Sequence, residues 1–210
     1  MKKILVLTIL VMCIMNMSAK TLEPIKLSAP QTKGGKAIME AFNDRRSDRE
    51  YSSKELSIED ISNLLWAACG INRPDGRRTS PTARNMQEID VYLLNKDGAY
   101  LYVPQENLLR PIYTGDLREA LANGQDFVKS SPICLLIVGD VSKFGEPNDR
   151  STKMMFCDGG IVSQNINMFC AGHNLATVTR GMMDEKVLRN ALKLTDTQYL
   201  ILNNPVGYKK

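Results

Sequence analysis

Apolar residues recur every three or four positions in several stretches of the chain, as they do along one face of a helix. The clearest run follows Ser57, a good helix N-cap, and stops at Gly70. Its apolar members are Ile58, Ile61, Leu64, Leu65 and Ala68. Further helices are predicted over residues 36–43, 116–123, 158–174 and 184–192.

Two of these helices carry a further expectation. The 36–43 helix is expected to turn Ile38, Met39 and Phe42 toward a core. The 158–174 helix is apolar nearly all round, so we expect it to be buried, either in the core or against a second subunit.

Alternating apolar and polar residues, and short apolar runs, predict the strands. Apolar and polar residues alternate over 88–94, and a second strand is predicted over 99–103, after a hairpin signal at 95–98. Residues 133–138 form a continuous apolar run typical of a central strand, and shorter strands are expected over 176–179 and 199–202. Because helices mix with a hairpin and with strands that are distant in sequence, the pattern predicts an α+β fold.

The first nineteen residues have a different pattern. Lys2 and Lys3 precede an apolar run that is too short to span a bilayer, and small residues follow at Ser18-Ala19. We therefore interpret residues 1–19 as a signal peptide cleaved near Ala19, residues 20–36 as a linker, and residues 37–210 as one domain. The protein is expected to be exported to the periplasm, with no membrane span after cleavage. Cys13 leaves a lipid anchor as an alternative, although Met12 is large for the position before a lipid-modified cysteine.

Composition excludes several classes of function. An apolar fraction of 43% and a charged fraction of 24% are typical of a soluble globular domain. Aromatic residues make up 6% and do not alternate with basic ones, so nucleic-acid binding is not expected. The single histidine, His173, argues against a histidine-based triad or a zinc site. Four widely spaced cysteines follow the signal peptide, and free thiols are favoured over the disulfides that an exported chain could form.

Arg45-Arg46-Ser47-Asp48-Arg49 is a compact set of hydrogen-bond donors. Guanidinium groups present paired N–H groups that match phosphate oxygens. If the segment is extended, Arg45, Ser47 and Arg49 share one side and Arg46 points away. The segment read alone is also compatible with a solvated basic loop, whose charge Asp44, Asp48 and Glu50 partly compensate.

Four segments in order resemble the nitroreductase family of flavoproteins, most closely its subgroup of SagB-type dehydrogenases. They are residues 45–51, residues 64–87, residues 158–181 and the C-terminal 205–209, so the resemblance covers roughly residues 40–210. It implies the nitroreductase α+β fold, with a mostly antiparallel central sheet flanked by helices, in an intertwined homodimer. It also implies an FMN cofactor bound between the subunits.

The resemblance assigns roles to particular segments. The first segment contacts the FMN phosphate and ribityl chain in the family, and the loop before residue 88 reaches the flavin from the partner subunit. Residues 179–181 are expected to bring backbone N–H groups to the isoalloxazine edge. The residues expected to bind FMN are Arg45, Arg46, Ser47, Arg49, Ser80, Thr82, Asn85, Gln87, Asn123, Gln125, Thr179, Arg180, Gly181 and Lys209.

Some of these residues also fit roles outside cofactor binding. Asn85 and Gln87 could bond neighbouring loop backbone, and Lys209 could be part of a charged chain end. Gln164 and Asn165 suit an interface or core better than the cofactor.

The resemblance implies an exported FMN-dependent oxidoreductase with ping-pong kinetics. Electrons would pass from NAD(P)H or another donor, through FMN, to a nitro, quinone or other unsaturated acceptor. Hydride transfer through a flavin needs no acid or base from the protein, so no catalytic side chain and no metal are expected. NAD(P)H is scarce outside the inner membrane, which leaves the donor open. The alternatives are a flavin-binding or partner-binding protein without turnover, and an azoline-type dehydrogenase.

Overall fold

The computed structural model describes residues 21–210; the expected signal peptide lies outside the described residues. Seven strands form one sheet in the order β1-β4-β3-β2-β5-β7-β6, and every neighbouring pair is antiparallel. The strands are β1 (Ile25–Lys26), β2 (Ile89–Leu94), β3 (Gly98–Val103), β4 (Leu108–Thr114), β5 (Ile133–Asp140), β6 (Leu175–Thr177) and β7 (Gln198–Tyr208). The helices are α1 (Ile38–Asp44), α2 (Ile58–Cys69), α3 (Arg118–Ala122), α4 (Asp149–Gly172) and α5 (Glu185–Leu192). Three short 3₁₀ turns are η1 (Ala83–Asn85), η2 (Asp126–Ser130) and η3 (Val141–Phe144).

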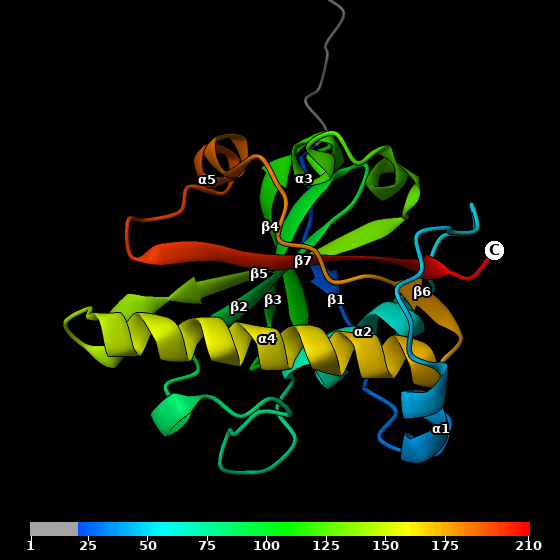
Figure 1. Cartoon of the computed structure of the whole chain (residues 1–210), viewed down its shortest axis with the longest axis horizontal. Coiled ribbons are helices and arrows are strands. Elements are labelled where there is room, and N and C mark those ends of the chain that lie inside the picture. Colours follow the sequence, from blue (N-terminus) through cyan, green and yellow to red (C-terminus); the bar gives the residue numbers. More distant parts are fainter. Residues whose placement is uncertain (1–20) are drawn as a thin grey trace, which may run out of the picture.

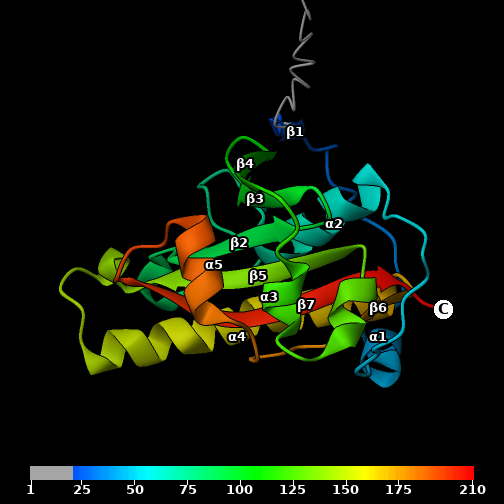
Figure 2. The same cartoon turned by 90° about the horizontal axis from the view of Figure 1, so that it is seen from above.

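Helices cover both faces of the sheet, so the described part of the chain has three layers (Figures 1 and 2). The cause is the alternation of side chains along strands such as β5. Leu135 and Ile137 pack into the core beneath α2 and α4, whereas Leu136 and Val138 pack into a second core beneath α3 and α5. The predicted α+β class and the antiparallel central sheet are confirmed.

The helices and strands with the clearest sequence patterns form where the sequence predicts them. The α2 helix is capped by Ser57, whose Oγ accepts the Asp60 N–H at 3.0 Å, and it ends at Gly70. The β2–β3 hairpin turns where its signal lies, and Asn95 Oδ1 accepts the N–H groups of Asp97 and Gly98. Strand β5 is central, between β2 and β7.

One expectation about packing is wrong. The α1 helix is close to its predicted bounds, but Ile38, Met39 and Phe42 are 61%, 74% and 52% exposed in the single chain. A helix of two turns has room for one buried stripe, and here Ala41 occupies it against α4.

Some element bounds also differ from the prediction. The α4 helix begins nine residues early, because Asn148 and Ser151 form a capping box ahead of the apolar stretch. Strand β4 was not predicted, because Pro111 interrupts its pattern. Pro111 is tolerated because it lies past Leu108 and Leu109, the two residues that pair with the edge strand β1. Strand β7 continues through Asn203-Asn204-Pro205, well past its apolar part.

The segment 20–36 packs on the domain where the structure describes it. Leu22 and Leu27 are buried, and β1 pairs with β4.

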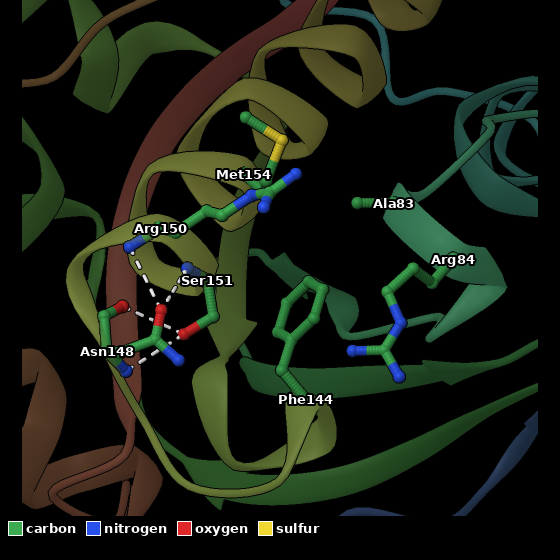
Figure 3. A pocket seen from close by; sticks show the side chains of 7 residues that line it. All are labelled: Ala83, Arg84, Phe144, Asn148, Arg150, Ser151 and Met154. Carbon is green, nitrogen blue, oxygen red and sulfur yellow. Dashed lines mark hydrogen bonds between the residues drawn. The ribbon is translucent and has the colours of Figure 1, made fainter.

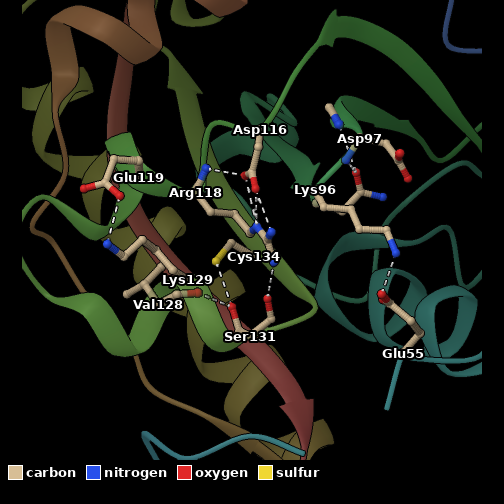
Figure 4. A network of polar contacts seen from close by, with 12 residues as sticks. Glu55, Lys96, Asp97, Asp116, Arg118, Glu119, Val128, Lys129, Ser131 and Cys134 are labelled. Carbon is tan, nitrogen blue, oxygen red and sulfur yellow. Dashed lines mark hydrogen bonds and ion pairs between the residues drawn. The ribbon is translucent and has the colours of Figure 1, made fainter. Parts of the chain in front are cut away.

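Near the start of α3, Arg118 donates two hydrogen bonds to the Asp116 carboxylate and one to the Ser131 carbonyl, at 2.9 Å (Figure 4). This contact ties the start of α3 to the start of β5.

The cysteines in the described part of the chain are free. Cys69, Cys134 and Cys170 are buried, as free structural thiols usually are, and Cys157 is exposed on α4.

Candidate functional site

The basic segment lies beside the C-terminal end of β7. The Asp48 N–H donates to the Thr177 carbonyl at 2.9 Å, and the backbones of Tyr51 and Lys209 pair as an isolated antiparallel β-bridge. This backbone pairing brings cations that are distant in the sequence around one hollow of about 370 Å³. Its lining is Arg46, Ser47, Asp48, Arg49, Glu50, Lys209 and Lys210.

Cations outnumber carboxylates in this basic hollow. Arg46 donates to Asp48 at 2.9 Å, and Lys209 Nζ is 3.8 Å from the same carboxylate. The Arg49 guanidinium lies 5.9 Å from the centre of the Phe127 ring, and no hydrogen bond joins it to another described residue. Arg49 and the exposed Ser47 hydroxyl therefore have donors to offer an anion.

The expected orientation of the basic residues is not the one observed. The segment is not a strand, so its side chains do not alternate strictly, and Arg46 lines the hollow together with Ser47 and Arg49. Arg45 is exposed and does not line it. The cause is that the Arg45 N–H is bonded to Ala41 at the end of α1 and the Asp48 N–H to Thr177 of β6, so Arg46 and Ser47 between them follow a loop path.

Arg180 is one of the few buried arginines, at 6% exposure. Its guanidinium donates to Gln125 Oε1 at 2.8 Å, to Asn203 Oδ1 at 2.7 Å, and to the carbonyls of Leu121 and Ala122. Its backbone N–H donates to the Asn203 carbonyl at 2.8 Å. Neither its backbone N–H nor most of its side-chain donors are available to a cofactor, contrary to the expectation for this residue.

Gln125 and Asn123, also expected near the cofactor, have local roles. Gln125 accepts a hydrogen bond from Arg180. Asn123 ends α3 in the left-handed conformation that asparagine tolerates, with φ of 43°. Gly181 is exposed, and nothing lies within 4 Å of where a Cβ would stand. Of the 179–181 segment, Gly181 is thus the open position.

Thr179 belongs to a polar network that sequence patterns did not reveal. Its Oγ1 is 2.8 Å from Ser163 Oγ and accepts Asn167 Nδ2 at 2.9 Å. Asn204, buried in β7, accepts the Ser163 hydroxyl at 2.8 Å. The pair Asn203-Asn204 in an otherwise apolar strand could have indicated this network, because buried amides need hydrogen-bond partners.

The loop between α2 and β2 holds the second group of predicted residues. The Gln87 N–H donates to Thr82 Oγ1 at 2.9 Å, and its side chain donates to the Gly76 carbonyl at 3.0 Å. Asn85 is exposed, and its Oδ1 lies 3.5 Å from Gln87 Nε2. Ser80 is buried, and its hydroxyl makes no hydrogen bond with the described residues. Gln87 thus bonds loop backbone, whereas Asn85 remains open to a ligand.

Two neighbouring buried carboxyls, of Asp158 and Glu88, lie at the base of this loop, and Asp158 holds it. Asp158 of α4 accepts the Ala83 N–H at 2.7 Å, and Glu88 is 1% exposed, with oxygens that make no hydrogen bond to the described residues. Burial, and then the neighbouring carboxyl of Asp158, raise the pKa of Glu88 to about 7.

The two groups of predicted residues contact opposite sides of α4. The 79–88 loop is bonded to Asp158, and Thr179 is bonded to Asn167, nine residues later. Nine residues are about two and a half helical turns, so the two side chains leave α4 in opposite directions. Within one chain, the width of α4 therefore separates the 79–88 loop from the 179–181 segment.

The described residues contain no group of side chains that could hold a metal ion. Over the same part of the chain, no helix is both long enough and apolar enough to cross a membrane.

The chain is similar to known proteins over most of its length. The profile of the nitroreductase family matches residues 43–208. A candidate nitroreductase of Methanocaldococcus jannaschii is 29% identical over 175 residues, which cover 79% of this chain and 87% of that protein. A solved candidate nitroreductase from Ralstonia eutropha JMP134 is 30% identical, with a TM-score of 0.82 over 89% of this chain and 90% of that one.

A more distant solved structure shares the fold. It is a chain of the E. coli microcin synthetase complex McbBCD with truncated pro-MccB17 bound, 19% identical with a TM-score of 0.69. The similarity covers 88% of this chain and 77% of that one.

Fold and relatives together define the class of protein, an α+β oxidoreductase. The chain belongs to the nitroreductase family, whose members generally use a flavin. The expected family is therefore confirmed.

Proposed function

We propose that the protein is an exported, homodimeric FMN-dependent oxidoreductase, and that the basic hollow holds the FMN phosphate. The observation that carries the proposal is the meeting of Arg46, Ser47 and Arg49 with Lys209 around one hollow. A phosphate monoester dianion suits this donor set, since arginine pairs with two phosphate oxygens at once and a hydroxyl supplies a further donor.

Thr179 and Gly181, which lie outside the lining of the hollow, suit the rest of the cofactor. The Thr179 hydroxyl is held in place by Ser163 and Asn167, and the exposed Gly181 leaves room for a flat ring to approach the backbone. When bound, the flavin would supply the hydride and electron chemistry. The protein's part is to hold the phosphate, orient the ring and admit donor and acceptor in turn.

A second copy of the chain would complete the site. Asn85 is open to a ligand but lies across α4 from Gly181, so in this proposal it approaches the flavin of the partner subunit. The outward residues of α1 are exposed and apolar, which suits burial between subunits. The subunit interface would then also be the cofactor site.

The donor and acceptor are proposed only by class. They are NAD(P)H or another reductant, and a nitro, quinone or other unsaturated acceptor, in a ping-pong cycle. Export rests on the signal peptide predicted at residues 1–19. Specificity of the SagB type, with azoline oxidation, would require a modified peptide as the substrate.

Retention of FMN tests the phosphate assignment. The mature protein should purify yellow or take up FMN, and Arg46→Ala with Arg49→Ala should weaken FMN binding by about 100-fold or more, because two charge-assisted contacts are lost. Quenching of FMN fluorescence measures the affinity. Lys96→Ala with Arg110→Ala removes two exposed cations elsewhere and should leave the affinity unchanged.

Two outcomes would contradict parts of the proposal. Equal FMN affinity in the Arg46/Arg49 double variant and its control would remove the phosphate assignment. A yellow protein whose flavin no donor reduces would favour a flavin-binding protein without turnover.

A further inference from the structure

A small cavity of about 10 Å³ adjoins the basic hollow. Arg46, Asp48 and Lys209 line both spaces, whereas Asp44, the last residue of α1, lines only the cavity. Asp44 is not one of the residues expected to bind FMN. Its carboxylate nevertheless belongs to the charge balance around the basic hollow.

Asp44 is held by a lysine of the N-terminal segment. Lys36 Nζ is 2.5 Å from Asp44 Oδ2, and Lys36 is the one cation of the described chain that forms an ion pair with Asp44. The Lys36 backbone is fixed in turn, because its N–H donates to the Gly172 carbonyl at the end of α4, at 3.2 Å. The preceding Gly35, at φ of 76°, lies against the His173 ring, where an added Cβ would be 2.8 Å from Cε1. The fold therefore fixes the position from which Lys36 reaches Asp44.

Stability does not account for this pair. The two side chains are 32% and 31% exposed, and an ion pair as exposed as this contributes little to folding. Asp44 lies at the C-terminal end of α1, where the helix dipole disfavours a carboxylate and the last turn has no basic residue. The hydrogen bond from Lys36, followed by one from Asn43, lowers the pKa of Asp44, and the charge of Lys209 acts in the same direction. Asp44 is therefore an ionised carboxylate within electrostatic reach of Lys209.

Lys209 has charge to offer an anion only while no carboxylate neutralises it. Its Nζ is 3.8 Å from Asp48, near the outer limit of an ion pair, and the same carboxylate accepts Arg46 Nε at 2.9 Å. Asp48 is therefore shared between two cations and compensates Lys209 only in part. An unpaired Asp44 would be a second carboxylate beside Lys209 and would offset the charge that remains.

We propose that Lys36 is a positioning residue for the basic hollow, because it occupies Asp44 and thereby keeps Lys209 free to bind a phosphate. The inference rests on the proposed assignment of this hollow to the FMN phosphate. Lys36 itself does not line the hollow and acts only through Asp44. The 20–36 segment, which the sequence predicts to be a linker, thus contributes to cofactor affinity.

FMN and riboflavin, which lacks the phosphate, separate this charge effect from a loss of structure. Both affinities are measured on the mature protein by quenching of flavin fluorescence. Lys36→Gln should lower the FMN affinity about threefold to fivefold, the size expected of one exposed charge contact, and leave the riboflavin affinity unchanged. Adding Asp44→Asn to Lys36→Gln should restore the wild-type FMN affinity, because it removes the carboxylate that the first substitution releases.

A matched control breaks an exposed ion pair elsewhere. Arg110→Gln removes the contact of Arg110 with Glu106 on the β4 side of the sheet, and three strands lie between β4 and β7. The FMN and riboflavin affinities of this variant should equal those of the wild type.

Failure of the inference can be told from failure of the proposed function. If the wild type binds FMN no more tightly than riboflavin, the phosphate assignment fails and the inference fails with it. If the wild type prefers FMN and Lys36→Gln keeps the whole of that preference, only the inference is overturned. A loss of FMN affinity that Asp44→Asn does not restore would also overturn it, because Lys36 would then act through the packing of its segment.

Discussion

At the scale of single residues, Arg180 shows how a candidate ligand can be a structural residue. Its buried guanidinium holds the carbonyls that end α3, and Arg180→Ala would remove the donors that it gives to Leu121, Ala122 and Asn203. We expect a loss of about 3 kcal/mol or more in the free energy of unfolding, measured by urea denaturation. Arg110→Ala, at an exposed surface pair, should change it by less than about 0.5 kcal/mol. A loss of similar size in both variants would contradict this role.

Glu88 makes a prediction about pH. Burial and the Asp158 carboxyl raise its pKa from 4.5 to about 7, so between these values the folded state holds a proton that the unfolded state has released. The free energy of unfolding contributed by Glu88 therefore falls as pH rises from about 4.5 to about 7 and then levels off. Glu88→Gln mimics the protonated acid, so its stability advantage over the wild type should grow as pH rises from about 4.5 to about 7. Parallel pH profiles for the two proteins would show that Glu88 does not titrate in this way.

At the scale of elements, α4 positions most of the candidate groups. Its middle and C-terminal turns hold Thr179 through Ser163 and Asn167, while Asp158 holds the 79–88 loop. Its first two turns, which follow the Asn148 cap, place Arg150 and Met154 around a hollow that Arg84 also lines (Figure 3). A single long helix therefore spaces three polar regions along the molecule, and its length matters as much as its apolar pattern.

At the scale of the whole molecule, the exposed apolar face of α1 predicts a dimer. Met39→Glu with Phe42→Glu places two carboxylates on that face, and burying them between subunits would be unfavourable. Light scattering after size-exclusion chromatography should show a dimer for the wild type and a monomer for the variant. Val187→Glu, exposed on α5 across the sheet, should leave the dimer intact. A wild-type monomer, or a variant that stays dimeric, would contradict the proposed interface.

Local patterns in the sequence determined the α+β class, the α2 helix, the β2–β3 hairpin and the central strand β5. These features depend on side-chain spacing, caps and turn residues, which act over a few positions. The order of the four segments along the chain also indicated the family. The cation-rich segment at 45–49 was recognisable for the same reason, because its donors are neighbours along the chain.

Which of these residues share a site depends on the three-dimensional fold. It placed Lys209 beside Arg46 and Arg49, left Arg45 outside, and used the donors of Arg180 to hold α3 and β7. It also brought Arg84 and Arg150 to one hollow, although they are far apart in the sequence. These outcomes depend on contacts between distant segments, and neither periodicity nor local charge carries that information.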